Sequence, residues 1–276
     1  DAEQSTLWKR TLTDELTTPD TWEVALSGGV NKRETFERLL TERRLGDLAL
    51  LRNLRNMQQA GVPRAIVAAN MTERKWAKVL PYRFLAAARA IPQWEDLLDT
   101  ALLSATPETR LAGHTVIVVD VSGSMEDKLS EKSDLTRMDA ACGVAVMARE
   151  MCESVAIYTF SQQVVTLPTR RGLALRDAII TSQPHGGTYL GQALAAIQPH
   201  EPAESRLIVV TDEQAHDVPT FWGRKRYLIN VAPYKAGVGY DHITHIDGFS
   251  ERVLEYIGEI EPSAASRPVK SPHFTR

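Results

Sequence analysis

The chain has 276 residues, of which 43% are hydrophobic and 24% are charged, and its formal net charge is −3. This length suffices for a substantial core, in one large domain or in two smaller ones. No apolar run approaches membrane-spanning length and no signal peptide is recognisable, which excludes an integral membrane protein and favours a cytoplasmic one.

The two cysteines, Cys142 and Cys152, fall on one predicted helix and point in different directions. We interpret them as buried thiols in a reducing compartment, and not as a disulfide or a metal-binding pair. Because the sequence begins at Asp1 inside a helical pattern, we expect a fragment of a longer protein.

Charge is distributed unevenly along the chain. Residues 32–89 contain thirteen Lys or Arg against five Asp or Glu, a net charge of +8, so the remainder of the chain carries −11. This contrast predicts two regions of different character.

Residues 1–110 are predicted to form a succession of short helices. Asn31 followed by Glu34 is typical of a helix start, and leucines recur at helical spacing in the segment DLALLRNLRNMQQAG. Helices of this length, separated by glycine and proline, indicate an all-α region of HEAT-like type.

In the segment LLRNLRNM the leucines are expected to pack inward, while Arg52, Asn53, Arg55 and Asn56 take the remaining faces. Such a face is either an ordinary solvated helix side or a surface that contacts nucleic-acid phosphates. Under the second interpretation, the candidate RNA-binding residues are Arg52, Arg55, Arg64, Lys75, Lys78 and Arg83.

From His114 onward, strand-like and helix-like segments alternate. The predicted strands are residues 114–121, 154–161, 164–168, 206–213, 226–233 and 242–248. The predicted helices are residues 134–152, 174–182, 190–198 and 250–260. This order predicts an α/β fold with a mostly parallel sheet, helices on both of its faces and one antiparallel edge strand.

Three loops bring small oxygen-bearing side chains to one edge of this sheet. The first predicted strand leads into DVSGS, a later loop reads HGGT, and another strand ends in TDE. The candidate metal ligands are Asp120, Ser122, Ser124, Thr188 and Asp212. Oxygen donors of this kind favour Mg²⁺, with Mn²⁺ or Ca²⁺ as alternatives, over zinc or copper.

Only two of these ligands are carboxylates, so a bound ion would stay electrophilic enough to accept an outside anion. Gly123, Gly186 and Gly187 are expected to let the backbone turn tightly and approach the ion.

The three loops together resemble the metal-ion-dependent adhesion site (MIDAS) of von Willebrand factor A domains. The segments TWEVALSGG, KRETFERLL and LALLRNLRNM resemble the TROVE module of the Ro ribonucleoprotein family. The resemblance covers nearly the whole chain and is strongest at residues 21–57 and 116–212. Family members carry more helices than this chain, so we expect a bacterial or phage member, or a C-terminal fragment of one.

The resemblance implies three parts. Residues 1–110 would be the HEAT-like C-terminal part of a TROVE module, residues 111–262 a Rossmann-like von Willebrand factor A domain, and residues 263–276 an extended tail. It also implies a non-enzymatic scaffold that binds small noncoding (Y-like) RNA and the ends of misfolded RNA, with no role for DNA. A protein partner would supply a carboxylate to the metal.

Two other functions remain open. One is a metal-dependent adhesion or chaperone-adaptor module that binds no RNA in this fragment. The other is an enzyme, which is disfavoured because the sequence has no G-x-x-x-x-G-K loop and no evident pair of nucleophile and base.

The remaining histidines and loop acids are weak candidates for an active site. His242 and His245 are expected on opposite faces of a strand, which makes them poor joint ligands. His185 is either a plain loop residue or a ligand contact. Glu213 and Asp217 are interpreted as exposed loop acids.

Overall fold

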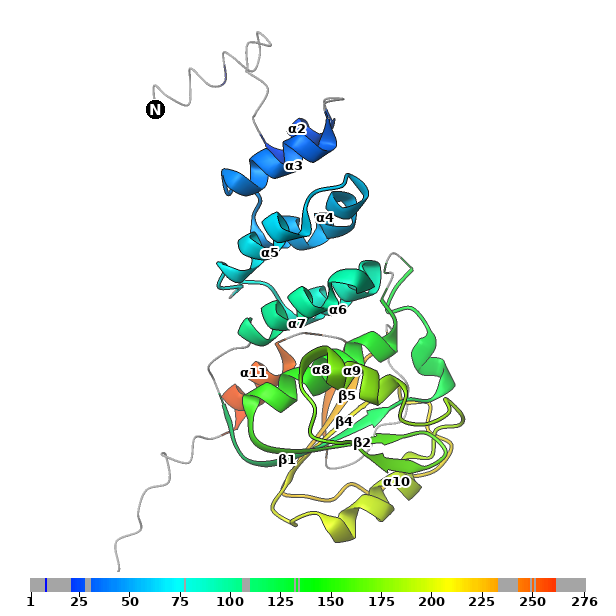
Figure 1. Cartoon of the computed structure of the whole chain (residues 1–276). Coiled ribbons are helices and arrows are strands. Elements are labelled where there is room, and N and C mark those ends of the chain that lie inside the picture. Colours follow the sequence, from blue (N-terminus) through cyan, green and yellow to red (C-terminus); the bar gives the residue numbers. More distant parts are fainter. Residues whose placement is uncertain are drawn as a thin grey trace, which may run out of the picture. The chain divides into compact units, whose positions relative to one another are not determined.

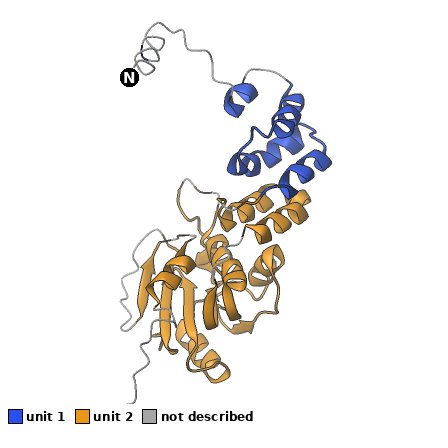
Figure 2. Cartoon of the chain, turned by 90° about the vertical axis from the view of Figure 1, so that its left-hand side faces the viewer, with its two compact units in different colours: residues 1–74 blue, residues 75–276 orange. Residues whose placement is uncertain are grey.

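The computed structural model describes most of the chain. It covers residues 8, 21–27, 31–76, 78–105, 110–131, 133, 135–232, 243–248, 250 and 252–261. Within these residues, no helix is long and apolar enough to cross a membrane. The chain divides into two compact units, residues 1–74 and residues 75–276 (Figure 2).

The first unit is helical throughout its described part. Its helices are α2 (Trp22–Ser27), α3 (Lys32–Thr41), α4 (Asp47–Gln59) and α5 (Arg64–Thr72). Apolar side chains from three of these helices form the core, among them Phe36, Leu50 and Val67. This supports the all-α prediction for these residues.

Local side-chain contacts fix the ends and faces of these helices. At the predicted start of α3, the Asn31 side chain accepts a hydrogen bond from the Arg33 amide and donates one to Glu34. The expectation for Asn53 was wrong: it is buried and donates to the carbonyl of Ala49, one turn earlier. Its amide side chain satisfies the helix backbone and does not face solvent.

The second unit contains a six-stranded sheet. Its strands are β1 (Leu111–Asp120), β2 (Cys152–Phe160), β3 (Val164–Thr166), β4 (Arg206–Thr211), β5 (Lys225–Asn230) and β6 (Thr244–Asp247). Their order in the sheet is β3-β2-β1-β4-β5-β6. All neighbours are parallel except β2 and β3, so the predicted antiparallel edge strand is confirmed.

Helices cover both faces of this sheet (Figure 1). The helices around the sheet are α8 (Arg137–Met151), α9 (Gly172–Ile180), α10 (Leu190–Ile197) and α11 (Val253–Ile260). Helix α10 buries Leu190 and Leu194 against Val116 and Val209 of the sheet. Helix α8 packs on β1 and β2 from the other side. The α/β fold class is therefore as predicted.

Two helices that precede the sheet belong to the same unit. Helices α6 (Pro81–Ala90) and α7 (Glu95–Ser104) pack on α8 and α9, respectively. A Cβ atom at Gly143 of α8 would lie 3.6 Å from Leu85 of α6, which shows how closely these helices approach. The expected boundary near residue 110 marks the change from helices to strands, and it remains a prediction about sequence modules.

Both cysteines lie in this unit and are buried as free thiols. Burial raises the pKa of the Cys142 thiol well above its usual range. The expected C-terminal tail at residues 263–276 lies outside the described residues.

Candidate functional site

Two acidic residues lie at the ends of the neighbouring strands β1 and β4, where the order of the strands in the sheet changes direction. Strand β1 lies between β2 and β4, and the connections that follow β1 and β4 lead to opposite sides. Asp120 ends β1 and Asp212 directly follows β4, and both are 0% exposed. In open parallel sheets, such a switch point at the carboxyl ends of the strands is the usual place for a ligand.

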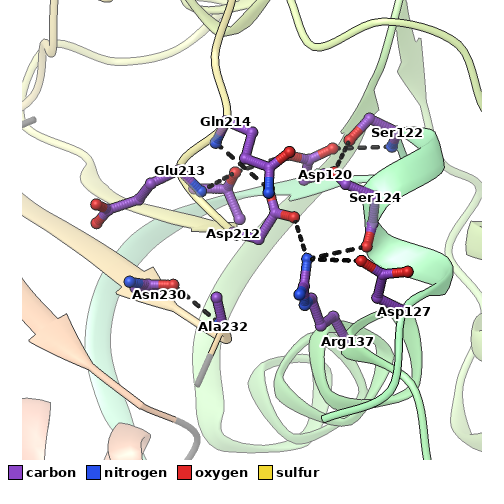
Figure 3. Close-up of polar contacts among 11 residues, drawn as sticks. Asp120, Ser122, Ser124, Asp127, Arg137, Asp212, Glu213, Gln214, Asn230 and Ala232 are labelled. Atoms are coloured by element: carbon purple, nitrogen blue, oxygen red, sulfur yellow. Dashed lines mark hydrogen bonds and ion pairs between the residues drawn. The ribbon is translucent and has the colours of Figure 1, made fainter. Parts of the chain in front are cut away.

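The turn after β1 directs three predicted ligands toward one point (Figure 3). Asp120 Oδ1 accepts a hydrogen bond from the Ser122 amide at 2.8 Å, and its Oδ2 accepts one from the Thr211 hydroxyl at 2.6 Å. The hydroxyl oxygens of Ser122 and Ser124 lie 3.3 Å apart. Asp120 is thus held on both of its oxygens, and the two serines are grouped beside it.

The HGGT loop lies directly against this turn. The Gly123 amide donates to the Gly186 carbonyl at 3.2 Å, which joins the two loops through their backbones. Thr188 is buried; its amide donates to His216 Nδ1 at 3.0 Å, and its carbonyl accepts from the His216 amide at 2.8 Å. His216 was missed at the sequence level because it lies far from Thr188 along the chain.

The expected reason for the glycines needs correction. Gly123, Gly186 and Gly187 do not have the positive φ angles that favour glycine. Space is short at two of them: a Cβ atom at Gly186 would lie 2.6 Å from the Gln162 side chain, and one at Gly187 would lie 3.2 Å from His216. A Cβ atom at Gly123 would make only an ordinary contact, 3.4 Å from the His185 carbonyl. The loop therefore depends on close packing and not on left-handed turns.

A buried arginine already neutralises part of the site. Arg137 Nη1 lies 2.7 Å from Asp212 Oδ2, 3.2 Å from the Ser124 carbonyl and 3.4 Å from Asp127 Oδ2 (Figure 3). The side chains of Arg137 and Asp212 are 7% and 0% exposed, so this is a buried ion pair. The guanidinium thus lies beside Asp212, at a position to which a metal ion would also be attracted.

The start of helix α8 fixes the position of Arg137. Thr136 and Asp139 form a reciprocal capping box, and the Arg137 amide donates to the Asp127 carbonyl at 2.9 Å. A cation in the first turn of a helix opposes the helix dipole. Arg137 therefore goes against the local preference, and its partner Asp212 explains why.

Burial changes the proton affinity of the site. It raises the pKa of Asp120 to about 6, and the nearby charge of Asp212 adds to the rise, while hydrogen bonds from Ser122 and Thr211 oppose it. Two buried carboxylates whose charges interact favour a cation. The residues present, two carboxylates and three hydroxyls, fit a hard divalent ion.

His185 and Asp217, which the sequence analysis also singled out, form hydrogen bonds away from the two buried carboxylates. His185 Nδ1 contacts Glu126 Oε1 at 2.7 Å and its Nε2 contacts the Ile180 carbonyl at 3.0 Å. Burial lowers the pKa of His185, but these hydrogen bonds outweigh that effect and raise it. Asp217 is half-buried and accepts hydrogen bonds from the first turn of α10, so it is not a plain exposed acid.

The interpretation of Glu213 as an exposed acid was wrong, because only 5% of its surface is exposed. The sequence predicts a loop at this position, and loops are usually solvated, but the Glu213 side chain is buried in contact with His245 of β6. His245 lies on β6, as expected, and His242 lies outside the described residues.

The candidate RNA-binding residues all lie on the surface. Exposed side chains are found at Arg52, Arg55, Arg64, Lys75, Lys78 and Arg83. In the described part of the chain, Arg52 and Arg55 take part in no ion pair, whereas other arginines of the first unit do. Those ion pairs are Arg33–Glu37, Arg38–Glu42, Arg43–Glu73 and Arg74–Asp47.

Two family models match the chain in overlapping segments. The TROVE domain matches residues 13–138, and the von Willebrand factor type A domain matches residues 115–214. Together they cover residues 13–214, which include helices α2 to α10 and strands β1 to β4. The chain belongs to the Ro family.

One solved structure shares the fold of this chain. The Ro-family chain is similar to the RO (RSR) protein of Deinococcus radiodurans, with a TM-score of 0.53 and 21% identity. The match covers 79% of this chain and 52% of that protein, so the chain spans about half the length of this relative.

A weaker similarity links the chain to an aerotolerance-related membrane protein of Bacteroides fragilis, with a TM-score of 0.38 and 15% identity. That match covers 53% of this chain and 96% of that protein. No curated protein sequence matches the chain.

Replacement of Arg137 tests its role as an internal counter-ion. Arg137→Met keeps most of the buried stem but leaves Asp212 as an uncompensated buried charge, which costs about 3–5 kcal/mol. We expect a lower melting temperature in EDTA, and a larger rise on addition of Mg²⁺ than in the wild type. The control Arg89→Met removes a more exposed arginine that pairs with Asp139. Equal Mg²⁺ responses in wild type and Arg137→Met would contradict this role.

The raised pKa of Asp120 predicts a specific pH dependence of stability without metal. Between pH 4 and about 6 the folded chain retains a proton that the unfolded chain releases, so this group lowers stability as the pH rises. Asp120→Asn removes the effect. Urea unfolding in EDTA should therefore show the variant gaining up to about 3 kcal/mol over wild type from pH 4 to 7.

The control for this measurement is Glu131→Gln, which alters an exposed carboxylate. A stability difference between Asp120→Asn and wild type that stays constant with pH would show that burial does not raise the pKa of Asp120.

Proposed function

We propose that this Ro-family chain is a non-enzymatic RNA-binding scaffold that also carries a metal-dependent site for a protein partner. RNA, including small noncoding (Y-like) RNA and the ends of misfolded RNA, would bind through the exposed cations of the helical region. The von Willebrand factor A domain would bind a divalent ion, and a carboxylate of the partner would complete its coordination.

The observation that carries the RNA proposal is the pairing pattern of the arginines. Acids neutralise Arg33, Arg38 and Arg43 within the first unit, but Arg52 and Arg55 are exposed and outside any ion pair of the described residues. These two lie three residues apart on α4 and so share one side of the helix. Exposed cations of this kind are available for phosphate groups.

For the metal, the proposed ligands are the residues predicted from the sequence. They are Asp120, Ser122, Ser124, Thr188 and Asp212. Burial of the two carboxylates, and the grouping of the serine hydroxyls beside Asp120, support a hard cation, with Mg²⁺ as the best fit. When bound, such an ion would act as a Lewis acid toward an outside carboxylate.

Neighbouring residues of the chain hold the two carboxylates in place. The hydrogen bonds from Ser122 and Thr211 fix the orientation of Asp120. Arg137 neutralises Asp212 through Oδ2, and an ion that uses this oxygen must displace the guanidinium. The site therefore favours a cation that outcompetes a guanidinium, which suits a doubly charged ion better than Na⁺ or K⁺.

The main alternative is a protein-interaction module that binds no RNA. The basic segment of residues 32–89, with a net charge of +8, discriminates between the two functions, because a pure adhesion module has no need for exposed unpaired arginines. An RNA scaffold requires them, and its affinity should depend steeply on salt.

RNA binding is tested with a duplex that carries a single-stranded 3′ tail, compared with a blunt duplex. Fluorescence anisotropy at several salt concentrations gives the affinity and its salt dependence. The Arg52→Ala/Arg55→Ala variant should bind more weakly, and the slope of log K against log salt should shrink by about 0.7–0.9 for each lost phosphate contact.

The matched control is Arg33→Ala/Arg38→Ala, which also removes two charges but from arginines already paired with Glu37 and Glu42. It should change the salt slope much less. If wild type does not bind at low salt, or if both double variants behave alike, RNA binding through α4 is wrong.

The independence of the two sites is tested with Asp120→Ala. Because the metal would lose a ligand, the stabilisation by Mg²⁺ should disappear; at an ion concentration of 100 times Kd it is worth about 2.7 kcal/mol in wild type. RNA affinity should remain within about twofold. A parallel loss of RNA binding in a variant that circular dichroism shows to be folded would contradict the separation.

A further inference from the structure

Glu213 occupies an unfavourable conformation next to the site described above. Its φ of 62° lies in the left-handed region, which is costly for a residue with a side chain. Its amide donates to the Thr211 hydroxyl at 3.1 Å, which stabilises the turn. As a result, Asp212 reaches Arg137 while the Glu213 side chain points away from it (Figure 3).

The Glu213 carboxylate is buried with only one of its oxygens bonded. Its side chain is 0% exposed, and Oε1 contacts His245 Nε2. Oε2 is also buried and, within the described part of the chain, has no hydrogen-bond partner. Leaving a buried carboxylate oxygen unsatisfied is costly, and a bound ion or water is a common reason for such an atom.

The imidazole of His245 is held from its other side. His245 and Asp247 are two residues apart on β6 and so face the same side of the sheet. Their atoms Nδ1 and Oδ1 lie 3.3 Å apart, and the Asn230 amide donates to the same Oδ1 at 3.5 Å. A histidine that binds a metal through one ring nitrogen usually forms a hydrogen bond with a carboxylate through the other.

We propose that Glu213 and His245 bind a second divalent cation of the zinc type, and that Asp247 positions the imidazole. One ligand atom from each of the three residues lies within 4.8 Å of the others. The side chains of His245 and Asp247 are 30% and 35% exposed, so an ion can enter from solvent and retain water ligands.

The donor atoms separate this site from the one at Asp120. There, all proposed ligands are oxygens, which suit Mg²⁺. An imidazole nitrogen beside a carboxylate favours Zn²⁺ or Co²⁺ instead. The two sites lie next to each other because Asp212 and Glu213 are consecutive residues, but they would select different ions.

Cobalt absorption provides the test, because protein-bound Co²⁺ with a nitrogen ligand gives visible bands. The full chain carrying Asp120→Asn, which disables the first site, is titrated with Co²⁺ and then with Zn²⁺. We expect a saturable band at one equivalent of Co²⁺ that Zn²⁺ displaces. His245→Ala and Glu213→Gln should each abolish the band, and Asp247→Asn should weaken Co²⁺ binding about 10–100-fold.

The matched control is His200→Ala, which removes another surface histidine and should leave the titration unchanged. Circular dichroism verifies that each variant is folded; His245 is partly exposed, so its replacement should preserve the fold even if Glu213→Gln does not. No saturable band, or a band that survives His245→Ala, would overturn the proposal. Loss of stability in His245→Ala without any Co²⁺ band would identify Glu213 and His245 as a plain ion pair.

Discussion

A buried ion pair between Arg137 and Asp212 sets the conditions for the whole carboxyl edge of the sheet. Parallel strands bring Asp120 and Asp212 together away from water, where two uncompensated carboxylates would oppose folding. Hydrogen bonds from Ser122 and Thr211 satisfy Asp120, and the guanidinium satisfies Asp212. Helix α8 must therefore begin where Arg137 can reach the strand ends, and its capping box holds it there.

Much of the sheet and its proposed metal ligands could be predicted from the sequence, because both depend on local patterns. The apolar run that precedes Asp120 identifies a buried strand, and parallel topology then brings its end next to Asp212. Arg137 and Glu213 were different cases. Their partners lie 75 and 32 residues away along the chain, and no periodicity indicates which distant side chain a loop or helix start will meet.

The packing of the helices could also be predicted only in part from the sequence. The prediction of short helices throughout residues 1–110 needed only the positions of glycine and proline and the spacing of leucines. That α6 and α7 would share a compact unit with the sheet depends on how they fit α8 and α9, including the absence of a side chain at Gly143. Sequence modules and compact units thus need not divide at the same residue, since one follows the pattern of the chain and the other follows packing.

The burial of both cysteines has a practical consequence for studying this chain. A thiol reacts through its thiolate, and the buried environment of Cys142 strongly disfavours that form. Cys152 is also buried, its pKa is raised by burial as well, and the sequence contains no third cysteine. One cysteine introduced on an exposed face would then be the reactive thiol, so a fluorophore or spin label could be attached at a chosen position without removing the native residues.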